Sequence, residues 1–113
     1  MAQAVFVQEG DAIDYTPSSD VAAGDVVVQG DLIGIAKQAI SANTLGALAV
    51  AGVFDVAKAS GGGVTFSAGD KVYWDNTNKL AVATDAGGTN KLLGKAIAAA
   101  ADADSTVRVR LSQ

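Results

Sequence analysis

The pattern Ala-Gly-Asp-x-Val occurs twice in this chain, and each copy leads into residues that favour β-strands. The first copy begins at Ala23 and runs into Val28, and the second begins at Ala68 and runs into Trp74. Gly-Asp predicts a turn, because Gly adopts backbone angles that other residues avoid and Asp hydrogen-bonds to nearby backbone groups. A β-prone run directly after a turn predicts a strand. The two copies therefore favour a fold built from short strands joined by tight turns.

Similar turn signals separate short β-prone runs along the whole chain, roughly every 8–12 residues. They predict an all-β fold, a small antiparallel β-barrel or sandwich of about nine or ten short strands. Residues 5–7 are the first expected strand, and Gly52 marks an expected bend between two strands. At most one short helix is expected. Residues 44–50 permit a helix as an alternative to a strand, and residues 98–103 permit a helical turn.

The chain also shows a weak internal repeat around the two Gly-Asp turns. The first turn is followed by Ile-Gly-Ile-Ala at residues 33–36. The second is followed by Leu-Gly-Lys-Ala at residues 93–96, after an inserted Asn-rich hairpin. These segments are either pseudo-equivalent halves of one barrel or two separate uses of the same turn chemistry. Two copies do not make a solenoid, and separate use is the favoured explanation.

The length of 113 residues predicts a single β domain over residues 1–113, with residues 1–8 as a candidate extended N-terminal arm. Half of the residues are hydrophobic, but most of these are Ala and Val. Small side chains bury little apolar surface each, so the core is thin, and association with further copies would add stability. The alternative is that abundant Ala and Gly simply permit tight packing of the strands.

Charge and composition disfavour several classes of function. The net charge of −4 disfavours non-specific binding to nucleic acid, which depends on Lys and Arg against phosphate. No apolar run reaches the ~20 residues of a membrane span, and the N-terminus lacks the pattern of a secretory signal. The chain has no His, no Cys and a single Glu. No catalytic residue set, metal site or cofactor site is therefore predicted.

Three segments invite a chemical interpretation and are explained better as structure. Residues 75–78, Asp-Asn-Thr-Asn, depart from the calcium-loop template and are expected to form a hairpin turn. Asp25 and Asp70 are expected to cap turns. Residues 24–32 resemble the turn of lipoyl and biotinyl carrier domains. The candidate attachment residue, Lys58, lies too far along the chain for that small fold, and we expect it at an exposed strand end.

Two segments resemble a family of small bacteriophage and prophage proteins known as capsid cement, or decoration, proteins. They are residues 52–58 (Gly-Val-Phe-Asp-Val-Ala-Lys) and 68–75 (Ala-Gly-Asp-Lys-Val-Tyr-Trp-Asp). Residues 7–16, 24–27, 93–96 and 106–111 are similar to the family as well. The likeness covers nearly the whole chain, and the order and spacing of the segments carry it. Ala57 stands where members often have Pro.

The resemblance implies a non-enzymatic phage structural protein, made in the cytoplasm of a bacterial host and bound to the outside of the capsid in the virion. Such proteins typically form homotrimers and clamp neighbouring subunits of the major capsid protein. The candidate contact residues, for the oligomer or the capsid, are Val5, Phe6, Val7, Tyr15 and Trp74. We expect residues 1–8 to add a strand to a neighbour. The alternative is an ordinary edge strand of the same subunit.

A second hypothesis is a small β-barrel module that binds a glycan or a small molecule. A glycan site uses exposed aromatic rings beside polar groups. Tyr73 and Trp74 lie on opposite faces of one expected strand, because successive side chains of a strand alternate. At most one of them is exposed there, which weakens this hypothesis.

Overall fold

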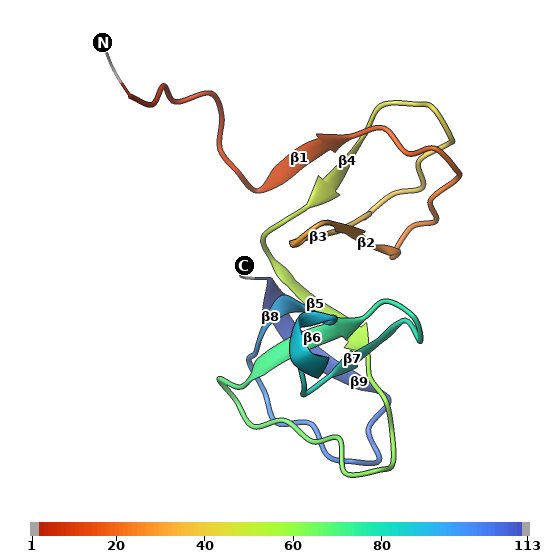
Figure 1. Ribbon diagram of the computed structural model, residues 1–113, viewed down its shortest axis with the longest axis vertical. Helices are drawn as coiled ribbons and strands as arrows, with labels where there is room; N and C mark the ends of the chain where they lie inside the picture. The colour runs from red at the N-terminus through yellow and green to blue at the C-terminus, as the bar shows by residue number, and fades with distance from the viewer. Residues whose placement is uncertain (1–2, 112–113) are drawn as a thin grey trace.

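The computed structural model describes residues 3–111, which form two antiparallel β-sheets joined at residues 50–52 (Figure 1). The first sheet has the order β1-β4-β3-β2 and contains β1 (Ala12–Tyr15), β2 (Val26–Gln29), β3 (Leu32–Ile35) and β4 (Gly46–Ala49). The second has the order β5-β9-β8-β6-β7 and contains β5 (Val53–Ala57), β6 (Lys71–Asp75), β7 (Leu80–Val82), β8 (Lys91–Ala96) and β9 (Thr106–Leu111). A 3-10 turn, η1 (Ala86–Gly88), precedes β8.

These elements confirm the predicted all-β fold and the predicted number of strands. Neither sheet closes into a complete barrel, although the two edges of the second sheet meet at a single bridge between Lys58 and Ala81. Gly52 has a φ of 117° and lies at the expected bend, between β4 and β5. The helical alternatives are not observed. Residues 46–49 form β4, and Ala100 forms an isolated bridge with Phe66.

The predicted strand at residues 5–7 is wrong. Residues 3–11 form no strand, and none of the described strands pairs with Val5, Phe6 or Val7. A strand is held by hydrogen bonds to a neighbouring strand, so β-prone residues without such a neighbour remain irregular. For the described part of the chain, the alternative of an ordinary edge strand in the same subunit is therefore not observed either.

The two Gly-Asp turns are built in the same way. The Asp25 carboxylate accepts a hydrogen bond from the Ala22 N–H at 2.9 Å, and the Asp70 carboxylate accepts one from the Ser67 N–H at 2.8 Å. In each turn the Asp N–H also donates back to the same partner's carbonyl, at 3.1 Å in both cases. The prediction that these Asp residues cap turns is confirmed.

The equivalence extends to the whole sheets. The order β1-β4-β3-β2 corresponds to β5-β9-β8-β6, and the second sheet adds β7 and η1 between the equivalents of β2 and β3. The register agrees, since Val27 lies opposite Gly34 in the first sheet and Val72 lies opposite Gly94 in the second. The prediction of two separate uses of one turn chemistry is therefore wrong. The halves are pseudo-equivalent, although they form two open sheets and not one barrel.

Apolar side chains form two buried clusters. The larger cluster joins the two sheets, because Ile33 and Ile35 of β3 pack with residues of the second sheet. The smaller cluster belongs to the first sheet and contains Ala36, Ile40 and Leu48 as its buried members. Four partly buried residues pack against the smaller cluster: Ile13, Tyr15, Val21 and Val27. One face of the first sheet is thus only partly covered.

Glycine at matched positions of β3 and β8 allows a neighbouring strand to approach closely. A Cβ atom on Gly34 would lie 2.7 Å from the Cβ of Leu48. A Cβ atom on Gly94 would overlap the carbonyl oxygen of Arg110 in β9. The β6–β8 register shifts beside Gly94, between Val72 and Tyr73, as is common where Gly interrupts a strand.

Candidate functional site

The N-terminal arm, residues 3–11, carries the most exposed of the large apolar side chains in the described chain. Val5, Phe6 and Val7 are 78%, 77% and 85% exposed. The arm runs from the start of β1 away from both sheets (Figure 1). Burial of such side chains stabilises a protein by roughly 1.5–3 kcal/mol each, so their joint exposure is unfavourable. The arm has the properties of a segment that binds a partner.

The other two candidate contact residues lie elsewhere. Tyr15 is half-buried at the end of β1, against the smaller cluster. Trp74 is 5% exposed and packs in the larger cluster, where its Nε1 donates to Asn76 Oδ1 at 3.2 Å. The structure therefore does not bring all five candidates together. Because a buried side chain offers little surface to a partner, we leave Trp74 out of the proposed interface.

The free edge of β2 is an interaction surface that the sequence-based candidates did not include. Strand β2 lies at one edge of the first sheet, and its three Val residues are half-buried. The uncovered edge of a sheet presents backbone N–H and C=O groups to which another strand can pair. The signal in the sequence was the uninterrupted Val run. Its position at an edge depends on the strand order, which the sequence does not contain.

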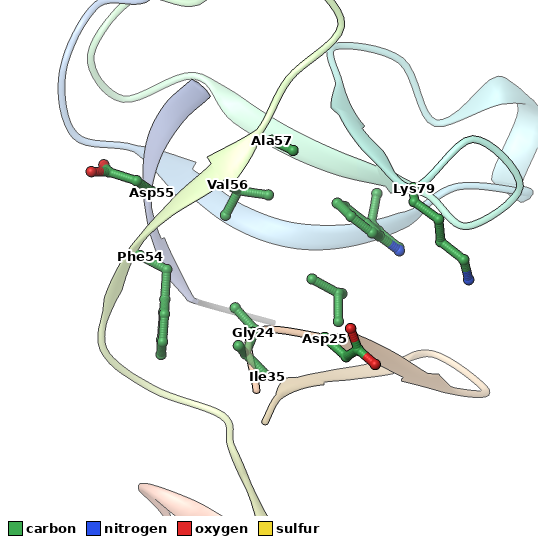
Figure 2. A pocket seen from close by; sticks show the side chains of 10 residues that line it. Gly24, Asp25, Ile35, Phe54, Asp55, Val56, Ala57 and Lys79 are labelled. Carbon is green, nitrogen blue, oxygen red and sulfur yellow. The ribbon is translucent and has the colours of Figure 1, made fainter. Parts of the chain in front are cut away.

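A cavity of about 410 Å³ lies between the two sheets (Figure 2). Its lining includes Asp25 and Ile35 from the first half and Phe54 and Val56 from β5. In Figure 2 Phe54 extends from β5 toward the β2–β3 hairpin, whereas the Asp55 carboxylate points away from it. The volume lies within the usual range of small-molecule sites, roughly 300–1,000 Å³.

The polar and aromatic groups around this cavity are held by the chain itself. The Asp25 carboxylate accepts from the Ala22 N–H, and Lys79 Nζ donates to Asn76 Oδ1 at 2.8 Å. Of the two aromatic residues that line the cavity, Trp74 is buried and Phe54 is half-buried, and Tyr73 is half-buried outside the lining. A glycan site needs an exposed aromatic face for stacking, so the structure weakens the glycan hypothesis further.

The prediction of an exposed Lys58 is wrong, because this residue is only 3% exposed. Its Nζ donates to the carbonyl oxygens of Ala59, Asp104 and Asp102 at 2.7, 3.1 and 3.3 Å. A buried ammonium group needs hydrogen bonds in place of its lost water, and it has three protons to donate. The bonds to Asp102 and Asp104 tie the loop at residues 101–104 to the end of β5, and the third bond goes to the adjacent residue, Ala59. Lys58 therefore has a structural role.

Exposed carboxylates hold two further elements in place. Asp55 of β5 accepts hydrogen bonds from Arg108 of β9 at 2.8 and 3.1 Å, and these bonds lower the pKa of the Asp55 carboxyl. Asp75 accepts bonds from the backbone N–H groups of Asn78 and Thr77, which lower the pKa of its carboxyl. The second set confirms the predicted hairpin turn at residues 75–78.

Residues 3–111 contain no group of three His, Cys, Asp or Glu side chains placed to hold a metal ion. In the same part of the chain, no helix is long and apolar enough to cross a membrane. What these residues do offer is an exposed apolar arm and a free strand edge, and both are means of binding another polypeptide. The fold and this surface define a small β protein suited to protein–protein association.

The comparison with known families agrees with this class. The family model described as phage cement protein matches residues 7–111. Because the match covers nearly all of the 113 residues, the chain belongs to the phage cement protein family. Membership confirms the resemblance found in the sequence and supports a structural role in a phage capsid. No curated protein and no solved structure matches the chain.

Proposed function

We propose that this protein binds the outside of a phage capsid and stabilises the shell by clamping neighbouring subunits of the major capsid protein. The family match over residues 7–111 carries the proposal, and the exposed apolar arm supports it. In this proposal the protein acts without catalysis and without a cofactor, and neither nucleic acid nor a membrane is a partner. It is made in the cytoplasm of the bacterial host and then joins the virion.

The proposal includes self-association as a homotrimer. An icosahedral shell presents many copies of one binding site, and a trimer engages three of them at once. Linking sites in this way raises the apparent affinity by roughly 10²–10⁴ without any new contact. Each occupied site stabilises the assembled shell relative to its separated subunits, because the trimer binds only the assembled shell. Weak individual contacts can therefore stabilise a whole particle.

The proposed contact surface consists of Val5, Phe6 and Val7 on the arm, together with Tyr15 at the end of β1. The arm is exposed and β-prone, and it can add a strand to a neighbouring sheet. Addition of a strand supplies backbone hydrogen bonds, and the alternating apolar side chains supply burial. The half-buried face that includes Ile13 and Tyr15 of β1 adds apolar surface beyond the arm.

The direct test is binding of the purified protein to shells that lack it, assembled from the major capsid protein of the same phage. We expect saturable co-sedimentation and a higher temperature for thermal opening of the shells. Phe6→Ser should weaken binding at least tenfold. Ile97→Ser is the matched control, because Ile97 is also an exposed apolar residue but follows β8 in the second sheet. Failure of the full chain to bind such shells would refute the proposal.

The cavity between the sheets supports a second candidate function, binding of a small molecule. Trp74 is the chain's one tryptophan and lines this cavity, so its fluorescence reports an occupant. A protein that does not bind shells, and whose Trp74 fluorescence changes saturably with a ligand, would favour this function over capsid binding.

A further inference from the structure

We propose that the N-terminal arm of one copy pairs with the free edge of β2 in a second copy and covers the half-exposed face of the first sheet. The inference rests on the self-association included in the proposed function, and it names the two segments that join the subunits. It follows from a comparison of the pseudo-equivalent sheets, one of which has a strand that the other lacks.

The second sheet shows how this edge is covered when a strand is available. Strand β6 is the equivalent of β2, and β7 pairs with it from Tyr73–Val82 to Asp75–Leu80. Ala81 of β7 also forms the bridge to Lys58 at the opposite edge of that sheet. The first sheet has only the short turn between β2 and β3 in this place, so β1 and β2 are its two edges in the described chain.

One apolar face of the first sheet is less well covered than its equivalent in the second half. The register and the isolated bridges identify equivalent positions in the two halves. In each of three pairs the first residue is half-buried and its equivalent in the second half is buried: Val21 and Phe66, Val27 and Val72, Tyr15 and Val56. The same face is therefore formed twice. In the second half Ala81 of β7 and Ile33 and Ile35 of the first sheet join the cluster on that face, and the cluster of the first half has no such additional cover among the described residues.

The backbone of β2 is oriented to receive a strand. The carbonyl of Asp25, the residue before β2, accepts a hydrogen bond at 3.0 Å from the N–H of Ala36, the residue after β3. The Asp25 carbonyl therefore points toward β3. Alternate residues of an antiparallel strand direct their backbone groups to opposite sides. The backbone groups of Val27 therefore point toward β3, as the Asp25 carbonyl does. The N–H and C=O groups of Val26 and Val28 point to the open edge. A strand can pair there without disturbing β3.

The arm has the residues and the reach that this edge requires. Val5, Phe6 and Val7 are β-prone and highly exposed, and β7 likewise consists of three apolar residues. Residues 3–11 span about 30 Å when extended. The arm leads into β1, which lies at the other edge of the sheet from β2, and it runs away from the sheet (Figure 1). Exchange of arms between copies thus gives the β2 edge of each copy a neighbouring strand, and it buries the apolar side chains of each arm.

The first experiment measures the mass of four proteins in solution by light scattering on a sizing column. Val28→Pro removes the outward N–H but keeps the pairing with β3, since Pro is tolerated where the N–H of an edge strand faces solvent. Val28→Ala is its matched control, because it shortens the side chain but keeps that N–H. Deletion of residues 1–8 removes the part of the arm that contains Val5, Phe6 and Val7. We expect the full chain and Val28→Ala to assemble, at about 34 kDa for a trimer of 11.2-kDa subunits. Val28→Pro and the deletion should dissociate at concentrations at least tenfold higher.

The second experiment uses the absence of cysteine from the chain. Phe6→Cys protein is mixed with Gln29→Cys protein and oxidised, and a mixed disulfide-linked dimer of about 22 kDa is expected. Ser60→Cys replaces Gln29→Cys in the control mixture, because Ser60 is also exposed but lies in the second half of the chain. The control mixture should give no such enrichment. Trp74 fluorescence verifies that each variant is folded.

The outcomes separate this inference from the proposed function. An oligomer that survives both Val28→Pro and the arm deletion, or a lack of Phe6–Gln29 cross-links, overturns the exchange of arms and leaves capsid binding intact. A full chain that is monomeric at every concentration also overturns it. If that monomer still binds capsid shells, the capsid function stands, and the partner of the arm is then the capsid protein.

Discussion

The effect of Gly46→Ala on the free energy of unfolding should change sign when the neighbouring side chain, Ile40, is shortened to Ala. Gly46 begins β4, and a Cβ placed on it would lie 2.7 Å from two carbons of the Ile40 side chain and 2.8 Å from a third. Carbon atoms in good contact are about 3.5–4.0 Å apart, and Ile40 is buried. Gly46→Ala therefore forces a buried side chain to move, and overpacking of this kind costs about 1–3 kcal/mol.

Backbone entropy acts in the opposite direction. Gly in a strand is less favourable than Ala by roughly 0.5–1 kcal/mol, and Gly46 is not among the residues with positive φ, so Ala fits its backbone. The expected net effect of Gly46→Ala is a loss of about 0.5–2 kcal/mol in the free energy of unfolding. In the Ile40→Ala background the overlap is gone. There the same substitution should raise the free energy of unfolding by about 0.5–1 kcal/mol.

The pseudo-equivalent half supports this coupling. At the positions that correspond to Gly46 and Ile40, the second half has Val107 and Ala100. In the first half the larger side chain is Ile40 and its neighbour is Gly46. In the second half the sizes are reversed, since Val107 is the larger and Ala100 the smaller. Both arrangements fill the space between the same two elements, which is expected where one side chain can be large only if its neighbour is small.

Urea denaturation followed by Trp74 fluorescence measures the four free energies of unfolding, with all proteins at one concentration. Gly10→Ala is the control, because nothing lies within 4 Å of the position of its new Cβ. Its effect should stay within about 0.5 kcal/mol. If Gly46→Ala destabilises the protein equally in both backgrounds, to within about 0.5 kcal/mol, the two sites are independent and the reasoning is refuted.

Three further predictions follow from other contacts. Gly94→Ala should lower the free energy of unfolding by at least about 2 kcal/mol more than Gly46→Ala, because the new Cβ would meet backbone atoms and not a side chain. Equal losses of unfolding free energy for the two variants, measured by urea denaturation, would contradict this. Lys58→Met should cost about 1–3 kcal/mol in the free energy of unfolding. Hydrogen exchange should speed up over residues 101–104, which two of its hydrogen bonds hold, and unchanged exchange there would count against the assigned role. The lowered pKa values of Asp55 and Asp75 stabilise the fold fully above the ordinary carboxyl pKa, near pH 4, and this contribution is lost as pH falls through the lower folded-state values. Asp55→Asn should therefore flatten part of the acid-side fall in melting temperature, and an identical profile would argue against the linkage.

The sequence by itself determined the features that depend on neighbouring residues. The Gly-Asp turns and the hairpin at residues 75–78 are held by hydrogen bonds between groups two or three residues apart, as in Ser67 with Asp70. Local turn chemistry and short β-prone runs therefore sufficed to predict an all-β fold of about nine or ten strands. The order and spacing of the same segments sufficed for the family, because a family pattern is itself a property of the sequence.

Only the tertiary structure decided which strands are neighbours, and the remaining findings depend on that. Lys58 is buried because carbonyl groups 44 and 46 residues further along the chain converge on its Nζ. The strand order revealed the two equivalent halves, the open edge of β2 and the absence of any partner for residues 5–7 among the described strands. Such contacts join residues that are distant in sequence, and neither propensity nor alternation of side chains specifies which distant segment supplies the partner.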